Sequence, residues 1–228
     1  MMRLRPMVFA HRGGAAEAPE NSISAFRRAA ALGVDGIETD LRASSDGLVV
    51  LHHDADLVLP DGRIVPISAM EGEELVVLRP DVPTLAAALD AVRGNFVWVL
   101  ELKPTPHPAA LLAGLQLVLR QHRAKVTLAS LSAPLLAQAA AAHPGVPLVA
   151  VVESAAALEA FAALKLHAVA AALPCAAELK VPGREIWAWT IRSAAEARAL
   201  SAAGVAGLIS DIPRATLQAL GAASVAEA

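Results

Sequence analysis

Short, nearly continuous apolar runs alternate along this chain with longer segments whose apolar residues recur at helical spacing. Runs such as LVAVV at 148–152 are typical of strands buried on both faces of a parallel sheet. The pattern predicts eight such strands, near Met7–His11, Gly36–Leu41, Phe96–Leu102, Val126–Ser130, Leu148–Val152, His167–Ala171, Glu185–Ile191 and Gly207–Ser210.

Alanine-rich segments with amphipathic spacing separate these runs, and alanine favours helix more than any other residue. Helices are predicted over Ser22–Leu32, Thr84–Val92, Pro108–His122, Ala133–Ala142, Ser154–Leu164 and Ala194–Ala203. Eight β units joined by helices within 228 residues predict a (β/α)8 TIM barrel, with a doubly wound open sheet as the alternative. We expect one domain over 1–228, with a tail that frays after Leu220.

One connection, from Leu41 to Thr84, is too long for a simple loop between a strand and a helix. It contains turn residues at 45–47 and 61–62, with a strand-like run at Leu48–Leu51 between them. Long connections inside a compact domain usually serve function. We therefore expect a short insertion over about 54–83, following the second strand.

Composition narrows the class of protein. The 19 basic and 22 acidic residues give a net charge of −3 without a basic stripe, which argues against nucleic acid as a partner. The apolar stretch Met7–Ala10 is too short for a signal-peptide core, and no run approaches the ~18 apolar residues of a membrane span. The single cysteine, Cys175, excludes an internal disulfide. A cytoplasmic protein is predicted, and its oligomeric state is left open.

Three carboxylates are candidates for a cation site. Side chains two residues apart in a strand share a face, so Glu38 and Asp40 converge at the end of the second strand. Glu101 ends the buried strand of WVLELKP. Paired carboxylates repel each other unless a cation or a proton compensates, and Mg²⁺ prefers such ligands. The structural alternatives are pairing with Arg42 for the first two and with Lys103 for Glu101.

Two histidines are candidates for acid–base chemistry. A hairpin turn centred between Ser45 and Asp46 would return His53 beside Glu38, although a slip of one residue would present His52 instead. At the end of the first predicted strand stands His11. Histidine titrates near neutral pH, as an acid or base in such a site must.

Anion-binding and wall residues complete the candidate site. Arg12, followed by two glycines, can hold an anionic oxygen with two hydrogen bonds, and Lys103 can neutralise another. Trp189, near a strand end, either packs in the barrel wall or contacts substrate. For Asp211 we favour a cap on the last helix over a place in the site.

Together these residues resemble the glycerophosphodiester phosphodiesterase family, bacterial cytosolic type. The resemblance extends over nearly the whole chain, in family order, through HRGG at 11–14, APENS at 18–22, GIETDLRASSDGLVVLHHD at 36–54, PTL at 83–85, ELK at 101–103, WT at 189–190 and SDIP at 210–213. It implies a (β/α)8 barrel that hydrolyses glycerophosphodiesters to glycerol 3-phosphate and an alcohol.

The same resemblance implies roles for individual residues. Mg²⁺ or Ca²⁺ would be bound by Glu38, Asp40 and Glu101. The acid–base pair would be His11 and His53, and phosphate would be contacted by Arg12 and Lys103. Departures occur at Ile191-Arg192, where the family often has Asn, and at Ser130-Leu131 and Ser210-Asp211. They leave this chemistry intact and concern the alcohol and glycerol sides of the substrate.

Three other functions are weighed against this one. A related phosphodiesterase acting on lysophospholipids or glycerophosphoinositol would need an apolar rim, which LVLP and ELVVL of the insertion could supply. A barrel that binds phosphate esters without turnover should lack one of the five site residues, yet all five are present. A metallo-amidohydrolase fits less well, because no H-x-H ends the first strand.

Overall fold

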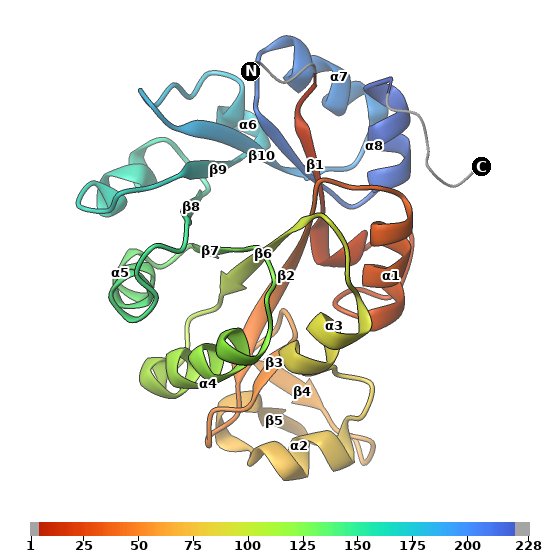
Figure 1. The fold of residues 1–228 in the computed structure, drawn as a ribbon, viewed down its shortest axis with the longest axis vertical. Coiled ribbons are helices and arrows are strands. Elements are labelled where there is room, and N and C mark those ends of the chain that lie inside the picture. The colour runs from red at the N-terminus through yellow and green to blue at the C-terminus, as the bar shows by residue number, and fades with distance from the viewer. Residues whose placement is uncertain (1–4, 222–228) are drawn as a thin grey trace.

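Eight parallel strands form a closed barrel in the computed structural model, which describes residues 5–221 (Figure 1). The expected fraying after Leu220 lies almost wholly outside this range. Neighbouring strands pair in sequence order and β1 pairs with both β2 and β11, which closes the ring. This confirms the predicted TIM barrel over the open sheet. The strands are β1 Met7–Ala10, β2 Gly36–Ala43, β6 Val97–Leu102, β7 Val126–Ser130, β8 Leu148–Val152, β9 Ala168–Ala172, β10 Glu185–Ile191 and β11 Gly207–Ser210.

Helices cover the outside of the ring, and the largest apolar cluster lies between them and the strands. They are η1 His11–Gly13, α1 Ile23–Ala31, α3 Leu85–Ala91, α4 Pro108–Gln121, α5 Ala133–Ala142, η3 Ala156–Phe161, α6 Leu173–Ala176, α7 Ala194–Ala202 and α8 Pro213–Ala219. In the described part of the chain, no helix combines the length and apolarity needed to cross a bilayer.

The helical stretch predicted over 154–164 contains a helix of the 3₁₀ kind, the short η3. Its more buried side chains are Leu158, Phe161 and Leu164, which are spaced three apart. A 3₁₀ helix has three residues per turn, so this spacing places all three on one face. The alanines between them favour helix without deciding which kind.

Inside the barrel, aromatic rings fill the end opposite the candidate site. Phe9 and Trp187 stack with ring centroids 4.4 Å apart. Gly36 and Gly207 make room for them, because a Cβ atom on either glycine would collide with one of the rings. The amino ends of the strands are therefore closed by packing, and the carboxyl ends remain for polar side chains.

The long connection forms a hairpin followed by a small layer of its own. β3 (Val49–Leu51) pairs antiparallel with β2, and the insertion adds β4 (Asp56–Val58), β5 (Ile64–Pro66), η2 (Ile67–Ala69) and α2 (Gly72–Leu78). The insertion packs on a separate apolar cluster that includes Leu57 and Leu75, and it projects from one end of the molecule (Figure 1).

The predicted register of the hairpin is wrong by one residue. Leu41 pairs with Leu51, and the turn bond joins Ser44 to Leu48. The loop therefore has three residues, centred on Asp46, and its last residue Gly47 takes a φ of +92°. Three-residue hairpin loops commonly end in such a left-handed residue, and their odd length moves the register by one position.

Candidate active site

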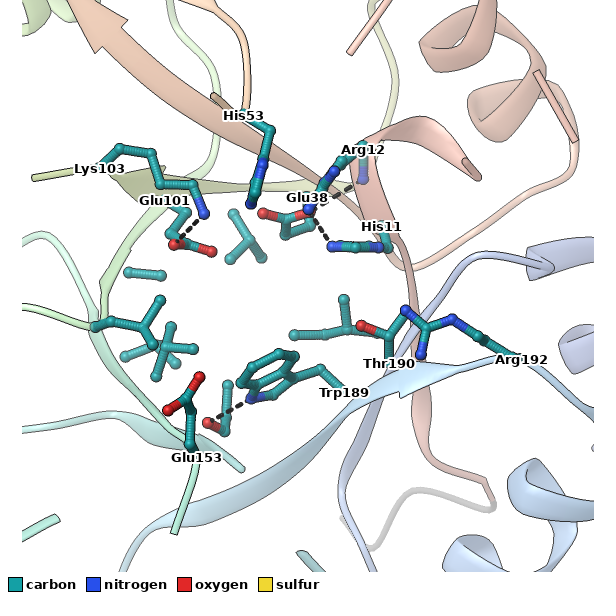
Figure 2. Close-up of a pocket in the computed structure, with 17 residues that line it drawn as sticks. His11, Arg12, Glu38, His53, Glu101, Lys103, Glu153, Trp189, Thr190 and Arg192 are labelled. Carbon is teal, nitrogen blue, oxygen red and sulfur yellow. Dashed lines mark hydrogen bonds and ion pairs between the residues drawn. The ribbon is translucent and has the colours of Figure 1, made fainter. Parts of the chain in front are cut away.

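A cavity of about 270 Å³ opens at the carboxyl ends of the barrel strands (Figure 2). This is the end at which TIM barrels place their active sites. Charged side chains from β1, β2, β6 and the hairpin line one side, and largely apolar residues from β7 to β11 line the other. The lining comprises His11, Arg12, Glu38, His53, Val99, Glu101, Lys103, Ala129, Leu131, Val149, Val151, Glu153, Ala170, Trp189, Thr190, Arg192 and Ile209.

Three carboxylates gather on the charged side, as the sequence pattern predicts. Glu38 and Asp40 alternate inward along β2, and Asp40 stands opposite Glu101 in the parallel ladder with β6. Each residue offers an oxygen within 4.8 Å of the others. Glu38 and Asp40 are only 3% and 1% exposed, so their charges are largely removed from water.

Burial and repulsion make this cluster costly in the absence of a cation. Burial, followed by repulsion from the Asp40 carboxylate, raises the pKa of Glu38 to about 8. Burial opposes ionisation of Asp40 as well, but the ammonium of Lys103 holds the pKa of Asp40 below its ordinary value. No hydrogen bond reaches the buried Oε1 of Glu38 from the described residues. An unsatisfied carboxylate oxygen beside two further carboxylates is suited to a divalent cation.

Lys103 bridges two members of the cluster. Its Nζ lies 2.6 Å from Oε1 of Glu101 and 2.8 Å from Oδ1 of Asp40. The Glu101–Lys103 pair considered in the sequence therefore exists, but it belongs to a larger network on the cavity wall. Arg42 does not pair with the cluster: its guanidinium donates to the carbonyl oxygens of His53 and Pro104.

Arg12 is held at the mouth of the cavity by three acidic partners. Its backbone N–H donates to Oε2 of Glu38 at 3.0 Å, Nε lies 3.2 Å from Oδ2 of Asp40, and Nη1 donates to Glu20. The residue takes a positive φ of 52°, within the short turn η1. The guanidinium thus faces both the cluster and the cavity.

Asp211 positions His11, which overturns the interpretation of Asp211 as a helix cap. Oδ1 of Asp211 lies 2.6 Å from Nδ1 of His11, and its other oxygen accepts from Nε of Arg192 at 3.1 Å. α8 begins at Pro213 without a side-chain cap. Burial lowers the pKa of His11, but the bond to Asp211 and the charge of Glu38 outweigh burial and raise it above its ordinary value.

His53 lines the same charged side of the cavity as His11, with Glu38 between them (Figure 2), although the predicted register is off by one. β3 ends at Leu51, and one further hydrogen bond, from the N–H of His52 to the carbonyl oxygen of Asp40 at 3.1 Å, places His52 rather than His53 opposite Asp40. Nδ1 of His53 lies 2.8 Å from Oδ1 of Asp54. His52 is half-buried outside the cavity lining, and burial lowers its pKa.

Trp189 stands on the opposite wall, where its indole N–H donates to the carbonyl oxygen of Ala170 at 3.1 Å. Glu153, Thr190 and Arg192 line the same side of the opening (Figure 2). The sequence analysis did not assign Glu153 or Arg192 to the site. The signal for Glu153 was its place directly after the buried run LVAVV, where a barrel strand reaches the active-site end.

Asn21 is a further residue that sequence reasoning missed. It is 4% exposed, its Nδ2 donates to Oδ2 of Asp40 at 2.9 Å, and its Oδ1 accepts from Thr39. The cap of α1 is the next residue, Ser22, whose Oγ accepts from the N–H of Ala25. The Asn-Ser pair therefore divides two roles: Asn21 orients a carboxylate of the cluster and Ser22 starts the helix.

The chain is a closed (β/α)8 barrel with a polar cavity at the carboxyl ends of its strands, which is where TIM barrels place their functional sites. It belongs to the glycerophosphoryl diester phosphodiesterase family, whose model matches residues 11–215. A phosphodiesterase of Oleispira antarctica, solved in complex with the product sn-glycerol-3-phosphate, is 26% identical with a TM-score of 0.84 over 96% of this chain and 98% of that chain. Glycerophosphodiester phosphodiesterase from Thermotoga maritima shares the fold, with 22% identity and a TM-score of 0.79 over 95% and 99% of the two chains.

Curated relatives match over shorter stretches. Glycerophosphodiester phosphodiesterase of Caldanaerobacter subterraneus subsp. tengcongensis is 49% identical over 51 residues, which is 22% of this chain and 21% of that protein. An uncharacterized protein of Mycobacterium tuberculosis is 31% identical over 133 residues, 50% of this chain and 44% of its own length. The chain thus spans less than half the length of these curated relatives.

Proposed function

We propose that this protein hydrolyses glycerophosphodiesters to glycerol 3-phosphate and an alcohol, with a divalent cation, Mg²⁺ or Ca²⁺, held by Glu38, Asp40 and Glu101. The observation that carries the proposal is the cluster of three carboxylates with an unsatisfied Glu38 oxygen, in a cavity flanked by His11 and His53. Membership of the family and the product complex of the Oleispira antarctica relative support the choice of substrate.

The residues present fit a hard cation. Carboxylate oxygens are the ligands that Mg²⁺ and Ca²⁺ prefer, and a cation would compensate the repulsion that raises the pKa of Glu38. When bound, the ion would supply positive charge that stabilises the charge developing on phosphate. Arg12 and Lys103, both at the cavity edge of the cluster, would contact the phosphate oxygens and add to that stabilisation.

The two histidines share one feature that suits proton transfer, although His11 is the more buried of the two. Each has its Nδ1 beside an aspartate, Asp211 for His11 and Asp54 for His53. Such a bond fixes the ring and leaves Nε2 to exchange a proton with substrate. One histidine takes a proton from the nucleophile while the other gives a proton to the leaving alcohol oxygen as the P–O bond breaks. The nucleophile is either water or the neighbouring glycerol hydroxyl, which would give a cyclic phosphate first.

The dimensions of the cavity favour a small substrate. About 270 Å³ lies just below the usual range for small-molecule sites, and a glycerophosphodiester headgroup needs less room than a lysophospholipid. Cytoplasmic location stays a prediction of the sequence.

Hydrolysis of glycerophosphocholine, with and without EDTA, tests the proposal. His11→Ala and His53→Ala should each lower kcat by roughly 10²- to 10⁴-fold, the usual contribution of a general acid or base. His122→Ala serves as the matched control, because His122 lies at the end of α4 and outside the cavity lining. Full turnover in EDTA, or full activity of both cavity variants, would refute the assignment.

A further inference from the structure

Glu153 is a carboxylate on the cavity wall that the proposed chemistry does not use. It follows β8 directly and lines the cavity on the side opposite the carboxylate cluster (Figure 2). No hydrogen bond or ion pair joins its side-chain oxygens to another residue within 5–221. Its charge is therefore available to a ligand.

Trp189 stands at the same level of the barrel. In the ladders, Trp189 pairs with Ala172 of β9, and Val152, the residue before Glu153, pairs with Ala171. The indole N–H donates to the carbonyl oxygen of Ala170, so the ring leans over β9 toward β8. The aromatic ring and the carboxylate thus share one corner of the cavity.

Apolar side chains surround this corner. Val149, Val151, Ala170 and Leu131 line the cavity between Trp189 and the β6 side. The cation on this half, Arg192, already has a counter-charge in Asp211 at 3.1 Å. An aromatic face and a single free carboxylate within an apolar wall form a combination that favours an ammonium or quaternary ammonium group.

The two ends of the cavity are complementary to a zwitterion. Arg12, Lys103 and the proposed cation gather positive charge at one end, and Glu153 places negative charge at the other. A phosphodiester esterified to an amino alcohol has its own charges in the matching order. A neutral alcohol such as glycerol can donate a hydroxyl hydrogen bond to this carboxylate but brings no positive charge to pair with it.

We infer that Glu153 and Trp189 bind the positively charged group of the leaving alcohol, so that the enzyme prefers glycerophosphodiesters of amino alcohols such as choline and ethanolamine. This inference rests on the proposed function, because it assigns the alcohol side of the same site. It makes Glu153 a specificity residue: its charge selects the alcohol and takes no part in breaking the P–O bond.

The test compares kcat/KM for glycerophosphocholine with kcat/KM for the neutral substrate glycerophosphoglycerol. In Glu153→Gln, which keeps the shape and removes the charge, the choline-to-glycerol ratio should fall about tenfold, as expected when a charge partner is lost from a partly enclosed site. Glu159→Gln, an equal loss of charge on the exposed face of η3, should leave the ratio unchanged.

Each outcome decides between the two proposals. A wild-type enzyme that hydrolyses neither substrate overturns the proposed function. If the wild type hydrolyses both, a ratio that stays constant in Glu153→Gln, or falls equally in Glu159→Gln, overturns this inference alone. A wild type that prefers glycerophosphoglycerol also overturns it while leaving the proposed hydrolysis standing.

Discussion

In each of the two cavity histidines, Nδ1 lies beside the carboxylate of an aspartate. The two aspartates differ in how far they are from their histidine along the sequence. Asp54 is adjacent to His53, so sequence analysis could suggest that it orients the ring. Asp211 is separated from His11 by almost the whole chain, and the two meet only because β1 pairs with β11 when the barrel closes. A residue-level pattern cannot reveal such a contact before the topology is known, which is why Asp211 was interpreted as a cap.

Replacing Asp211 should shift the pH dependence of activity. Asp211 raises the pKa of His11, so Asp211→Asn should lower that pKa and move one limb of the pH profile to lower pH. If His11 acts as the acid the alkaline limb moves, and if it acts as the base the acidic limb moves. Loss of ring orientation should also lower kcat/KM by roughly 10- to 100-fold, less than loss of an acid or base itself.

A matched control exists for this substitution. Asp90 lies 3.3 Å from Nε2 of His122, another pair of aspartate and histidine, on the outer surface away from the cavity lining. Asp90→Asn should leave the pH profile of kcat/KM unchanged. A limb that stays in place in Asp211→Asn, or moves to higher pH, would contradict the proposed role of Asp211.

At the scale of elements, strand positions could be predicted closely, whereas the hairpin register and one helix type could not. Buried strands are recognised as short, nearly continuous apolar runs, because both of their faces pack in the core. The register of β2 with β3 depends on a three-residue loop, and SSDG is compatible with loops of two lengths. The 3₁₀ type of η3 could not be predicted, because alanine favours helix without fixing its pitch, which the spacing of Leu158, Phe161 and Leu164 determines.

The loop of the β2–β3 hairpin packs closely against Gly114 of α4, and this contact provides a test of how β3 is positioned. A Cβ atom on Gly114 would collide with the backbone oxygen of Gly47. Gly114→Ala gains about 1 kcal/mol of helix propensity, but overpacking against backbone typically costs 1–3 kcal/mol. We therefore expect a net loss of up to about 2 kcal/mol in the free energy of unfolding, measured in urea.

Intrinsic propensity can be separated from packing within the same helix. Ala113 is exposed on α4, so Ala113→Gly should cost only about 1 kcal/mol, the helix propensity difference. Because the hairpin places His53 on the cavity, Gly114→Ala should also lower kcat, whereas Ala113→Gly should not. A Gly114→Ala protein that is more stable than wild type would show that α4 can move away from the loop at no cost.

For the whole molecule, the barrel separates stability from function along its axis. The amino ends of the strands are packed with Phe9 and Trp187, while the carboxyl ends hold buried carboxylates that raise each other's free energy. The apolar runs of the strands could predict this architecture. In a parallel barrel the carboxyl ends of all strands meet at one end, so the polar residues that follow the apolar runs gather there. The contacts between segments far apart in the sequence, such as Asp211 with His11, became visible only in the closed barrel.

The buried cluster links the stability of the whole protein to pH and to cations. Without a cation the folded pKa of Glu38 is about 8, well above the ~4.3 of an unfolded glutamate. The folded state therefore binds a proton more tightly, and the stability contributed by protonated Glu38 is present below pH ~4.3 and lost as pH rises toward 8. In EDTA, the free energy of unfolding should decline over this window.

A bound divalent cation should oppose that decline, because it takes the place of the proton among the three carboxylates. At a concentration 100 times its Kd, a ligand specific for the folded state adds about 2.7 kcal/mol, which in a chain of this size raises Tm by roughly 5–10 °C. Calorimetry of wild type at pH 8, in EDTA and in Mg²⁺ or Ca²⁺, measures the rise. Glu38→Gln should be at least as stable as wild type in EDTA and should lose most of the response to cation. Equal responses in both proteins would place the bound ion elsewhere, because the buried Oε1 of Glu38 has no partner among residues 5–221, whereas the buried Oδ1 of Asp40 lies 2.8 Å from Nζ of Lys103.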